Sequence, residues 1–342
     1  MKRHAFITGT AGFIGYHLAD LLLSQGWAVT GFDGLTDYYD VTLKKARHAR
    51  LAQYPSFKPV IGRLEDSAAL HRAVADSAPE AIVHLAAQAG VRYSLENPRS
   101  YIDSNLVGTF NVLEAARLVS PDHLLMASTS SVYGGNPQMP FGERQQTDHP
   151  LTLYAATKKA NEDMAHSYAH LWRVPTTMFR FFSVYGPWGR PDLALFKFIK
   201  AALDDAPIDI YNFGHMSRDF TYVCDLVLAI SKLIDAAPIA GEPVAGDSLS
   251  PVAPYRVVNI GNSTAIGLMD MVQALEAALG RPIAKRMLPM QPGDVPHTWA
   301  DTTLLRSITG YTPDTDIADG VSAFVDWYLD YHATSLRQAV VA

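Results

Sequence analysis

The chain has 342 residues, of which 48% are hydrophobic and 18% charged, a balance that excludes a disordered or collagen-like protein. Its net charge of -6 argues against a broad basic surface, so we expect neither nucleic acid nor a membrane as a partner. The single cysteine, Cys224, cannot form an internal disulfide, and the opening residues lack the apolar stretch of a signal peptide. We therefore expect a cytoplasmic protein, either of two domains or of one large domain with an attached lobe.

Short apolar runs alternate with longer helical patterns through the first half of the chain. The first helical pattern has an apolar stripe that includes Ile14 and Leu18, and longer helices are predicted over 101–119 and 154–171. Strand, helix, strand order requires parallel pairing through right-handed crossovers. We therefore predict an α/β fold with a doubly wound parallel Rossmann sheet. Its expected strands are residues 5–8, 28–32, 57–61, 81–85, 123–127 and 176–182.

The alternation of strand and helix patterns ends after about residue 183. From there, Pro- and Gly-rich loops separate isolated helical patterns at 195–204, 268–279 and 317–328. This change predicts a smaller, discontinuous substrate-binding lobe formed by 183–214 and 263–342. The Rossmann domain would then comprise 1–182 and be completed by about 215–262. Residues 236–254, rich in proline and small side chains, are predicted to form a mobile surface loop.

A glycine-rich turn joins the first predicted strand to the first predicted helix. Gly9, Gly12 and Gly15 follow the pattern G-x-x-G-x-x-G, with Phe13 and Ile14 between the last two. Glycine permits a tight turn and a close approach of the backbone to a pyrophosphate, and the helix N-terminus supplies N–H groups to that anion. Three glycines can also be mere turn punctuation, but their place between strand and helix favours a dinucleotide site.

Asp33 ends the second predicted strand, 18 residues after Gly15. A carboxylate in this place accepts hydrogen bonds from the adenine ribose and repels a 2′-phosphate, which favours NAD over NADP. The sequence Asp33-Gly34 also suits a turn, which is compatible with ribose binding.

Tyr154 and Lys158 are spaced i and i+4 at the start of a predicted helix, so both side chains can act on one group. A free phenol, with a pKa of ~10, is a weak base at neutral pH, and we expect the Lys158 ammonium and a bound nicotinamide to lower it. Such a pair is common on helix surfaces. The favoured, catalytic interpretation rests on the nucleotide motif and on the preceding strand end at 127–134, which reads ASTSSVYG.

A metal site is the alternative for the same helix, because Glu162, His166 and His170 follow one another at intervals of four residues. Residues four apart do not lie directly above one another on a helix, and the pattern offers no further ligands. A solvated or interface face is therefore favoured over a metal site. We expect no metal.

Several longer sequence motifs resemble those of the extended short-chain dehydrogenase/reductase family, and in particular those of its NAD-dependent epimerase/dehydratase members. Over nearly the whole chain the likeness is greatest to UDP-glucuronate 4-epimerases. Beyond the glycine motif, the words that carry it are DYYD at 37–40, HLAAQAGVRYS at 84–94, YAATKKAN at 154–161, FFSVYGPWGRPD at 181–192 and QPGDVP at 291–296.

The resemblance implies that NAD is the cofactor and that Tyr154 is the base, with Thr129 bonded to the reacting hydroxyl. Lys158 would also hold the nicotinamide ribose, and Asn105 would support the site from a neighbouring helix. After the third strand the family has Gly-Asp-hydrophobic beside adenine, whereas this chain has Gly62, Arg63 and Leu64. Leu64 would keep its place, while Arg63 either stacks on the base or leaves that contact unmade. The residues expected to line the nicotinamide are Leu85, Ala86 and Ala87.

The substrate implied by the resemblance is a UDP-sugar, oxidised at C4 to a ketone, turned over and reduced on its other face. Other UDP-hexoses and their uronates are the alternatives to UDP-glucuronate. Family members that are dehydratases have a sequence like Thr-Asp-Glu, and decarboxylases one like Thr-Ser-Glu, where this chain has Thr129, Ser130 and Ser131. Because this chain lacks the acid at that place, neither reaction is favoured. A non-catalytic NAD-binding protein is not favoured either, because the tyrosine and the lysine are both present. The remaining expected substrate contacts are Ser130, Ser131, Ser183 and Arg190 at the sugar, and Arg218 and Asp294 at the nucleotide.

Relatives also imply a homodimer in which the helices at 101–119 and 154–171 of each subunit form a four-helix contact.

Overall fold

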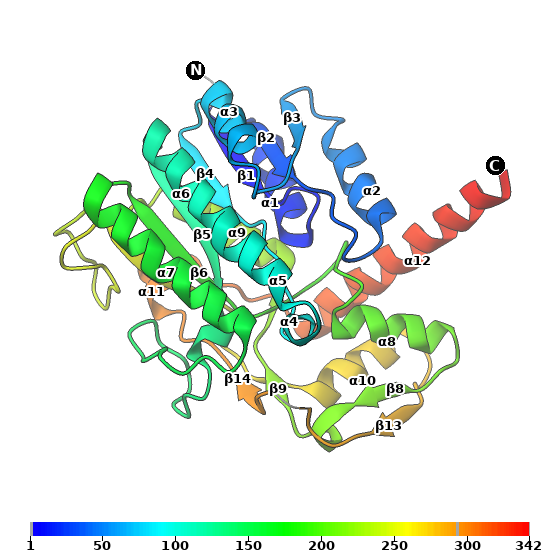
Figure 1. The fold of residues 1–342 in the computed structure, drawn as a ribbon. Helices are drawn as coiled ribbons and strands as arrows, with labels where there is room; N and C mark the ends of the chain where they lie inside the picture. The colour runs from blue at the N-terminus through cyan, green and yellow to red at the C-terminus, as the bar shows by residue number, and fades with distance from the viewer. Residues whose placement is uncertain (1–2, 292–293, 342) are drawn as a thin grey trace.

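A computed structural model describes residues 3–291 and 294–341. Its centre is a seven-stranded sheet in the order β11-β6-β5-β4-β1-β2-β3, and all of its strand pairs are parallel (Figure 1). The predicted doubly wound fold is confirmed. The strands are β1 (His4–Thr8), β2 (Ala28–Asp33), β3 (Phe57–Ile61), β4 (Ala81–His84), β5 (His123–Thr129), β6 (Thr176–Phe181) and β11 (Tyr255–Ile260).

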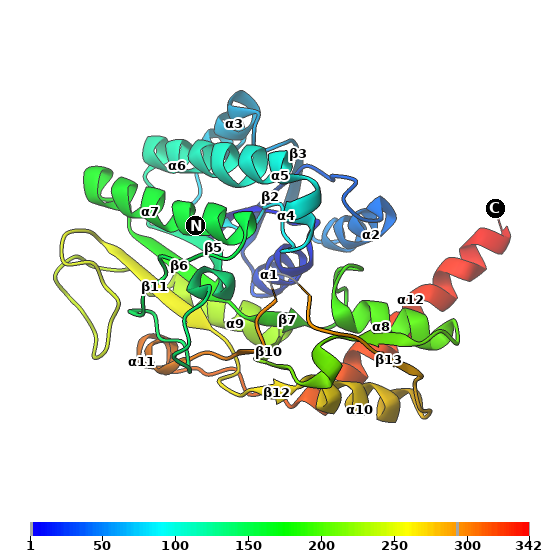
Figure 2. The same cartoon turned by 60° about the horizontal axis from the view of Figure 1, so that its bottom comes forward.

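Alternation of side chains along the strands builds two cores, one on each face of the sheet. In β1, Ala5 and Ile7 enter one core while Phe6 enters the other. Helices α3 (Ser67–Ser77), α6 (Gly108–Val119) and α7 (Leu153–Trp172) cover one face. Helices α1 (Phe13–Ser24), α2 (Val41–Leu51), α9 (Val223–Ile234) and α11 (Thr303–Thr309) cover the other. Figure 2 shows the two layers edge-on.

The structure differs from the predicted secondary structure in two places. Strand β11 was not predicted, although its sequence YRVVNI is a run typical of a buried strand. The helix predicted at 101–119 is one irregular helical stretch, made of α5 (Pro98–Tyr101), the π-helical segment η1 (Ile102–Val107) and α6. A short helix, α4 (Tyr93–Glu96), precedes it.

The loop at 236–254 is held by buried groups, in contrast to the mobile loop expected. Nε and Nη2 of Arg256, on β11, donate to the Asp247 carboxylate at 3.1 and 2.7 Å, and both side chains are buried. Arg144 also donates to the Asp247 carbonyl. A buried ion pair that is fully hydrogen-bonded fixes the backbone around it.

The C-terminal part of the chain forms a lobe with its own hydrophobic core, built from α8 (Ala194–Leu203), α10 (Leu268–Leu279) and α12 (Ile317–Val341). Figure 1 shows this lobe below the sheet. All three helices were predicted, but α12 is longer than the expected 317–328. The remaining strands form small sheets: β7 (Ser183–Tyr185) with β10 (Phe220–Tyr222), β8 (Ile208–Ile210) with β13 (Lys285–Met287), and β9 (Ser217–Arg218) with β12 (Ile266–Gly267) and β14 (His297–Thr298). Two short 3-10 segments are η2 (Ser130–Tyr133) and η3 (Tyr211–Gly214).

Candidate active site

One cavity of about 1030 Å³ lies between the carboxyl ends of the central strands and the C-terminal lobe. It brings together every site residue expected from the sequence except Asn105. In an open parallel sheet this edge is where ligands bind. The expected residues that line it are Gly9, Gly12, Phe13, Ile14, Gly15, Asp33, Leu64, Leu85, Ala86, Ala87, Thr129, Ser130, Ser131, Tyr154, Lys158, Ser183, Arg190, Arg218 and Asp294.

The glycine turn leaves no room for side chains. Gly9 has a φ of +85°, and a Cβ there would lie 2.9 Å from the Ala86 nitrogen. A Cβ on Gly15 would lie 2.1 Å from the Gly9 carbonyl oxygen. Helix α1 starts directly after Gly12, with neither a side-chain cap nor an acidic residue in its first turn. Its free N–H groups therefore face the cavity as an anion site, and the cradle fits a dinucleotide pyrophosphate.

Asp33 links the end of β2 to the glycine turn. Its Oδ2 accepts from the Ala11 amide at 2.9 Å, and its Oδ1 accepts from the Leu35 amide at 2.8 Å. Each oxygen keeps a second lone pair for a ribose hydroxyl. The nearby Lys44 is buried in the cavity wall over the ring of Tyr39, 4.3 Å from its centroid. We did not predict Lys44, since no motif sets it apart from its helix.

Thr8 and His84 fix the backbone of the segment at 85–87. The Thr8 hydroxyl accepts from the amides of Leu85 and Ala86, both at 3.1 Å. With both lone pairs used, it donates its proton to His84 Nδ1 at 2.8 Å, so that Nε2–H donates to Thr109 at 3.1 Å. Complete burial lowers the pKa of His84 to about 3, so the ring is neutral. Neither residue was predicted, although polar residues at strand ends are a usable signal.

Asn105 lies behind the cavity wall, in η1. Its amide exchanges hydrogen bonds with the Gln88 backbone at 2.8 and 3.0 Å and donates to Thr157 on α7 at 3.1 Å. With these bonds, Asn105 joins the cavity loop to α7. The support expected of Asn105 is thus indirect.

Tyr154 and Lys158 project into the cavity from the first turns of α7, whose first turn is capped by the Thr152 hydroxyl. Burial lowers the pKa of Lys158 to about 8, with the Glu162 charge opposing that effect. Burial raises the pKa of Tyr154, while a hydrogen bond with Thr129 and the positive charge of Arg190 lower it. We expected Lys158 to supply part of that lowering; in the protein alone, Thr129 and Arg190 supply it.

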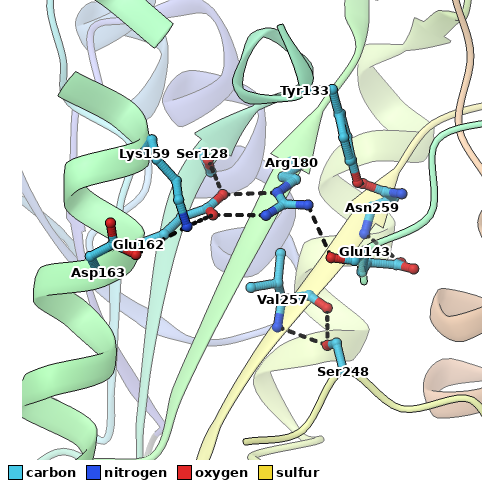
Figure 3. Close-up of polar contacts among 10 residues, drawn as sticks. All are labelled: Ser128, Tyr133, Glu143, Lys159, Glu162, Asp163, Arg180, Ser248, Val257 and Asn259. Atoms are coloured by element: carbon cyan, nitrogen blue, oxygen red, sulfur yellow. Dashed lines mark hydrogen bonds and ion pairs between the residues drawn. The ribbon is translucent and has the colours of Figure 1, made fainter. Parts of the chain in front are cut away.

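A buried polar network anchors α7 to the sheet (Figure 3). The Glu162 carboxylate, on α7, accepts from Nε and Nη2 of Arg180, on β6, at 2.9 and 2.8 Å. It also accepts from the Ser128 hydroxyl, on β5, at 2.6 Å. The Arg180 guanidinium packs over the Tyr133 ring, 4.7 Å from its centroid. The network therefore fixes α7 relative to the strand that carries Thr129.

The alternative metal site on α7 does not form in this arrangement. While Glu162 faces Arg180, His166 bonds to the Ser250 hydroxyl and His170 to the Val252 carbonyl. Over residues 3–291 and 294–341, no cluster of three or more possible metal ligands occurs. The three side chains point to different partners.

The hydroxyls after β5 form a small group of their own. Thr129 caps η2, accepting from the Ser131 amide at 3.2 Å, and its Oγ1 donates to the Ser131 hydroxyl at 3.2 Å. Ser183 lies in β7, with its amide bonded to the Asp219 carbonyl. These hydroxyls and Tyr154 line the same cavity.

Arg190 has a partner that we did not predict. Its Nε and Nη2 donate to the two carboxylate oxygens of Asp192 at 3.0 and 2.8 Å. Asp192 also accepts from the Tyr38 hydroxyl at 3.3 Å. All three residues line the cavity, so Arg190 is placed inward as expected, but as half of an ion pair.

At the lobe end of the cavity, Arg218 donates to the carbonyls of Ser217 and Pro296, and Asp294 accepts from Arg92 at 3.0 Å. Arg92 lies over the ring of Tyr211, 4.8 Å from its centroid. Arg92 and Tyr211 are cavity residues that had no assigned role. Pro292 and Gly293, part of the QPGDVP word, lie outside the described residues.

Arg63 and Leu64 differ in their surroundings. The Arg63 side chain is 64% exposed and pairs with Glu65 at 3.3 Å, whereas Leu64 is buried and its carbonyl accepts from Asn111. Both line the cavity near Asp33 and Gly34. An exposed guanidinium at the rim has room to stack on a ligand ring.

Among the described residues, no helix is both long and apolar enough to cross a membrane.

Comparison with known proteins accords with this site. The chain is 57% identical over 326 residues to a protein of Rhizobium meliloti (strain 1021) named probable UDP-glucuronate 4-epimerase, covering 94% of this chain and 96% of that one. It is 42% identical to UDP-glucuronate 4-epimerase 4 of Arabidopsis thaliana, covering 97% of this chain and 77% of that one.

The crystal structure of UDP-glucuronic acid 4-epimerase from Bacillus cereus, in complex with UDP-glucuronic acid and NAD, superposes with a TM-score of 0.86 at 30% identity. The superposition covers 96% of this chain and 99% of that one. A model of the NAD dependent epimerase/dehydratase family matches residues 5–246. The chain belongs to the NAD dependent epimerase/dehydratase family.

Proposed function

We propose that the protein is an NAD-dependent UDP-glucuronate 4-epimerase, an isomerase that interconverts UDP-glucuronate and UDP-galacturonate. The observation that carries the proposal is the joining, in one cavity, of a dinucleotide cradle with Thr129, Tyr154, Lys158 and an inward-facing arginine. Relatives of that name match nearly the whole chain.

The glycine turn would hold the pyrophosphate of NAD, Asp33 would hold its ribose, and Leu64 would pack at the adenine end. The backbone at 85–87, fixed by Thr8 and His84, forms the nicotinamide wall. When bound, the cofactor supplies reversible hydride acceptance at the sugar C4.

The protein's own groups handle the proton. Tyr154 takes the proton of the C4 hydroxyl, and Thr129 bonds that hydroxyl and orients it. The Glu162 charge favours the ammonium form of Lys158 against the effect of burial, and this ammonium stabilises the phenolate and would hold the nicotinamide ribose. Burial by itself raises the pKa of Tyr154, so the tyrosine can act as a base only when nearby positive charges lower that pKa.

The resulting 4-keto sugar turns over while the nucleotide stays bound. Arg218 and Asp294 hold the nucleotide, and Ser130, Ser131, Ser183 and Arg190 contact the sugar and its carboxylate. The acids that line the cavity, Asp33, Glu65, Asp192, Asp209 and Asp294, all lie outside the segment from β5 to η2. The segment from β5 to η2 that carries Thr129 thus supplies no acid to protonate a leaving hydroxide, which favours epimerisation over dehydration.

Incubation of purified protein with UDP-glucuronate, UDP-glucose and UDP-N-acetylglucosamine, each alone, tests the proposal when the 4-epimers are resolved by chromatography. We expect UDP-galacturonate to form fastest. Turnover of a neutral sugar alone would refute the uronate assignment, and a 4,6-dehydrated or pentose product from the wild-type protein would refute epimerisation.

We also propose a cytoplasmic homodimer in which α6 and α7 of each subunit meet. Large apolar side chains are exposed on or beside these helices, at Val107, Phe110, Leu118, Leu171 and Trp172. A monomeric mass by light scattering would refute the dimer.

The domain division that we propose is a Rossmann domain of 1–182 and about 215–262, with 183–214 and 263–342 as the substrate lobe.

A further inference from the structure

The pairing of Arg190 with Asp192 leaves half of the guanidinium uncommitted. The Nε–Nη2 edge donates to both oxygens of Asp192. The other edge, which carries Nη1, makes no hydrogen bond to the residues that the structure describes. The side chains are 21% and 25% exposed, and both face the cavity. Arg190 can therefore accept a second carboxylate end-on without releasing the first.

Asp192 is held independently of Arg190. The Tyr38 hydroxyl donates to its Oδ2, and the Tyr38 ring packs against Tyr93 with 4.7 Å between centroids. Gly90, at a φ of +103°, comes close enough that a Cβ there would lie 2.9 Å from the Tyr38 hydroxyl and 3.9 Å from Asp192. Besides Arg190, the Asp192 carboxylate thus has a hydrogen-bond donor on the segment that follows β2.

We propose that Asp192 is a resident counter-ion that weakens the binding of the sugar carboxylate to Arg190 and so permits the 4-keto sugar to turn over. This inference rests on the proposed function. To present both faces of C4, the sugar must move its C5 carboxylate out of one contact and into another. An unpaired arginine in this cavity would bind that carboxylate tightly in the first orientation and slow the turn.

The negative charge of Asp192 weakens the binding of a second carboxylate to Arg190. Asp192 repels a carboxylate bound to the free edge of Arg190, and it takes up the guanidinium charge when the sugar carboxylate leaves. Removing a like charge roughly 6 Å away, at an effective dielectric between 20 and 80, changes affinity by about tenfold. Asp192 thus weakens uronate binding and accelerates rotation. Tight binding of the ground state without a gain in the transition state does not raise kcat.

The variant Asp192→Asn tests this role, because it keeps one oxygen acceptor for Arg190 but removes the charge. We expect the dissociation constant for UDP-glucuronate, measured by calorimetry, to fall about tenfold, and kcat to fall as well. The steady-state absorbance of reduced nicotinamide should rise, since the keto sugar waits longer before reduction. Binding of UDP-glucose, which has no carboxylate, should not change.

Two further variants control for charge and for the acid-to-amide change. Asp192→Glu, which restores the charge, should bring the dissociation constant back toward the wild-type value. Asp205→Asn makes the same change at a surface carboxylate paired with Arg281 at 2.9 Å, outside the cavity, and should leave all four measurements unchanged.

Weaker or unchanged binding of UDP-glucuronate by Asp192→Asn would overturn the proposal, as would an equal effect on UDP-glucose. Failure of the proposed function is distinguishable, because then the wild-type protein itself would not epimerise UDP-glucuronate. A crystal structure of the wild-type protein with NAD and UDP-glucuronate tests the proposal without a variant. We expect the sugar carboxylate on the Nη1 edge of Arg190, and a carboxylate out of contact with Arg190 would overturn it.

Discussion

Replacement of Glu162 by glutamine should destabilise the protein severely, because the charge that it removes lies in the buried network under the catalytic helix. Glu162 and Arg180 are 3% and 4% exposed, so the change leaves a guanidinium without a counter-ion in the interior. Breaking a buried pair on one side costs about 3–5 kcal/mol. We expect the free energy of unfolding, measured in urea, to fall by about 3 kcal/mol or more.

Asp163→Asn, at the next position of α7, is the matched control. Its carboxylate pairs with Lys159 at 3.0 Å but is 67% exposed, and such a pair contributes at most about 0.5 kcal/mol. Replacing both Glu162 and Arg180 by methionine should be far less damaging than the sum of the two single changes, because no unpaired charge remains. A loss below about 1 kcal/mol for Glu162→Gln, or additivity in the double variant, would refute the reasoning.

The same change should also alter catalysis through Lys158. The Glu162 charge raises the pKa of Lys158 against the effect of burial, which leaves it at about 8. Loss of that charge moves the pKa lower, so the alkaline fall of kcat should begin at lower pH. An alkaline limb at the wild-type pH in Glu162→Gln would show that Lys158 does not depend on this carboxylate.

Three other outcomes are expected. Tyr154→Phe should abolish epimerisation while NAD stays bound, and a rate above about a tenth of wild type would exclude Tyr154 as the base. Arg190→Ala should slow epimerisation and release UDP-pentose with carbon dioxide, detectable by NMR, because a loosely held β-keto carboxylate can turn its bond to C5 perpendicular to the ketone plane. A wild-type rate without pentose would contradict this. Burial lowers the pKa of His84 to about 3 and that of His123 to about 4, so the folded state resists protonation that the unfolded state accepts below pH ~6.5. Unfolding free energy should therefore be lost as pH falls from ~6.5 toward 4, and His84→Gln should lessen the slope in urea titrations at several pH values; an unchanged slope would contradict the assignment.

The sequence sufficed for those parts of the site that depend on local spacing. The glycine turn, Asp33 and the pair Tyr154 and Lys158 lie on single elements or at their ends, where periodicity and order along the chain determine their positions. The six predicted strands were recognisable for the same reason. The likeness to a known family then identified residues such as Arg218 that no local pattern distinguishes.

The interactions that sequence reasoning missed are those between distant segments. Asp192 is two residues from Arg190, yet only the folded loop shows that they pair and that Tyr38, from another part of the chain, holds them. Thr8 and His84 likewise meet only because β1 and β4 are neighbours in the sheet. Which partner a buried polar side chain finds depends on register between elements, and no single-chain pattern encodes that register.

The position of β11 at the edge of the sheet has a consequence for how the chain folds during synthesis. Strand β6, whose residues 176–181 leave the ribosome early, pairs on one side with β11 at 255–260. Until about residue 260 has been made, β6, which carries Phe179 and Phe181, remains an open edge that is available for pairing with other chains. We therefore expect a truncation before β11 to aggregate although it retains the whole glycine motif and Tyr154.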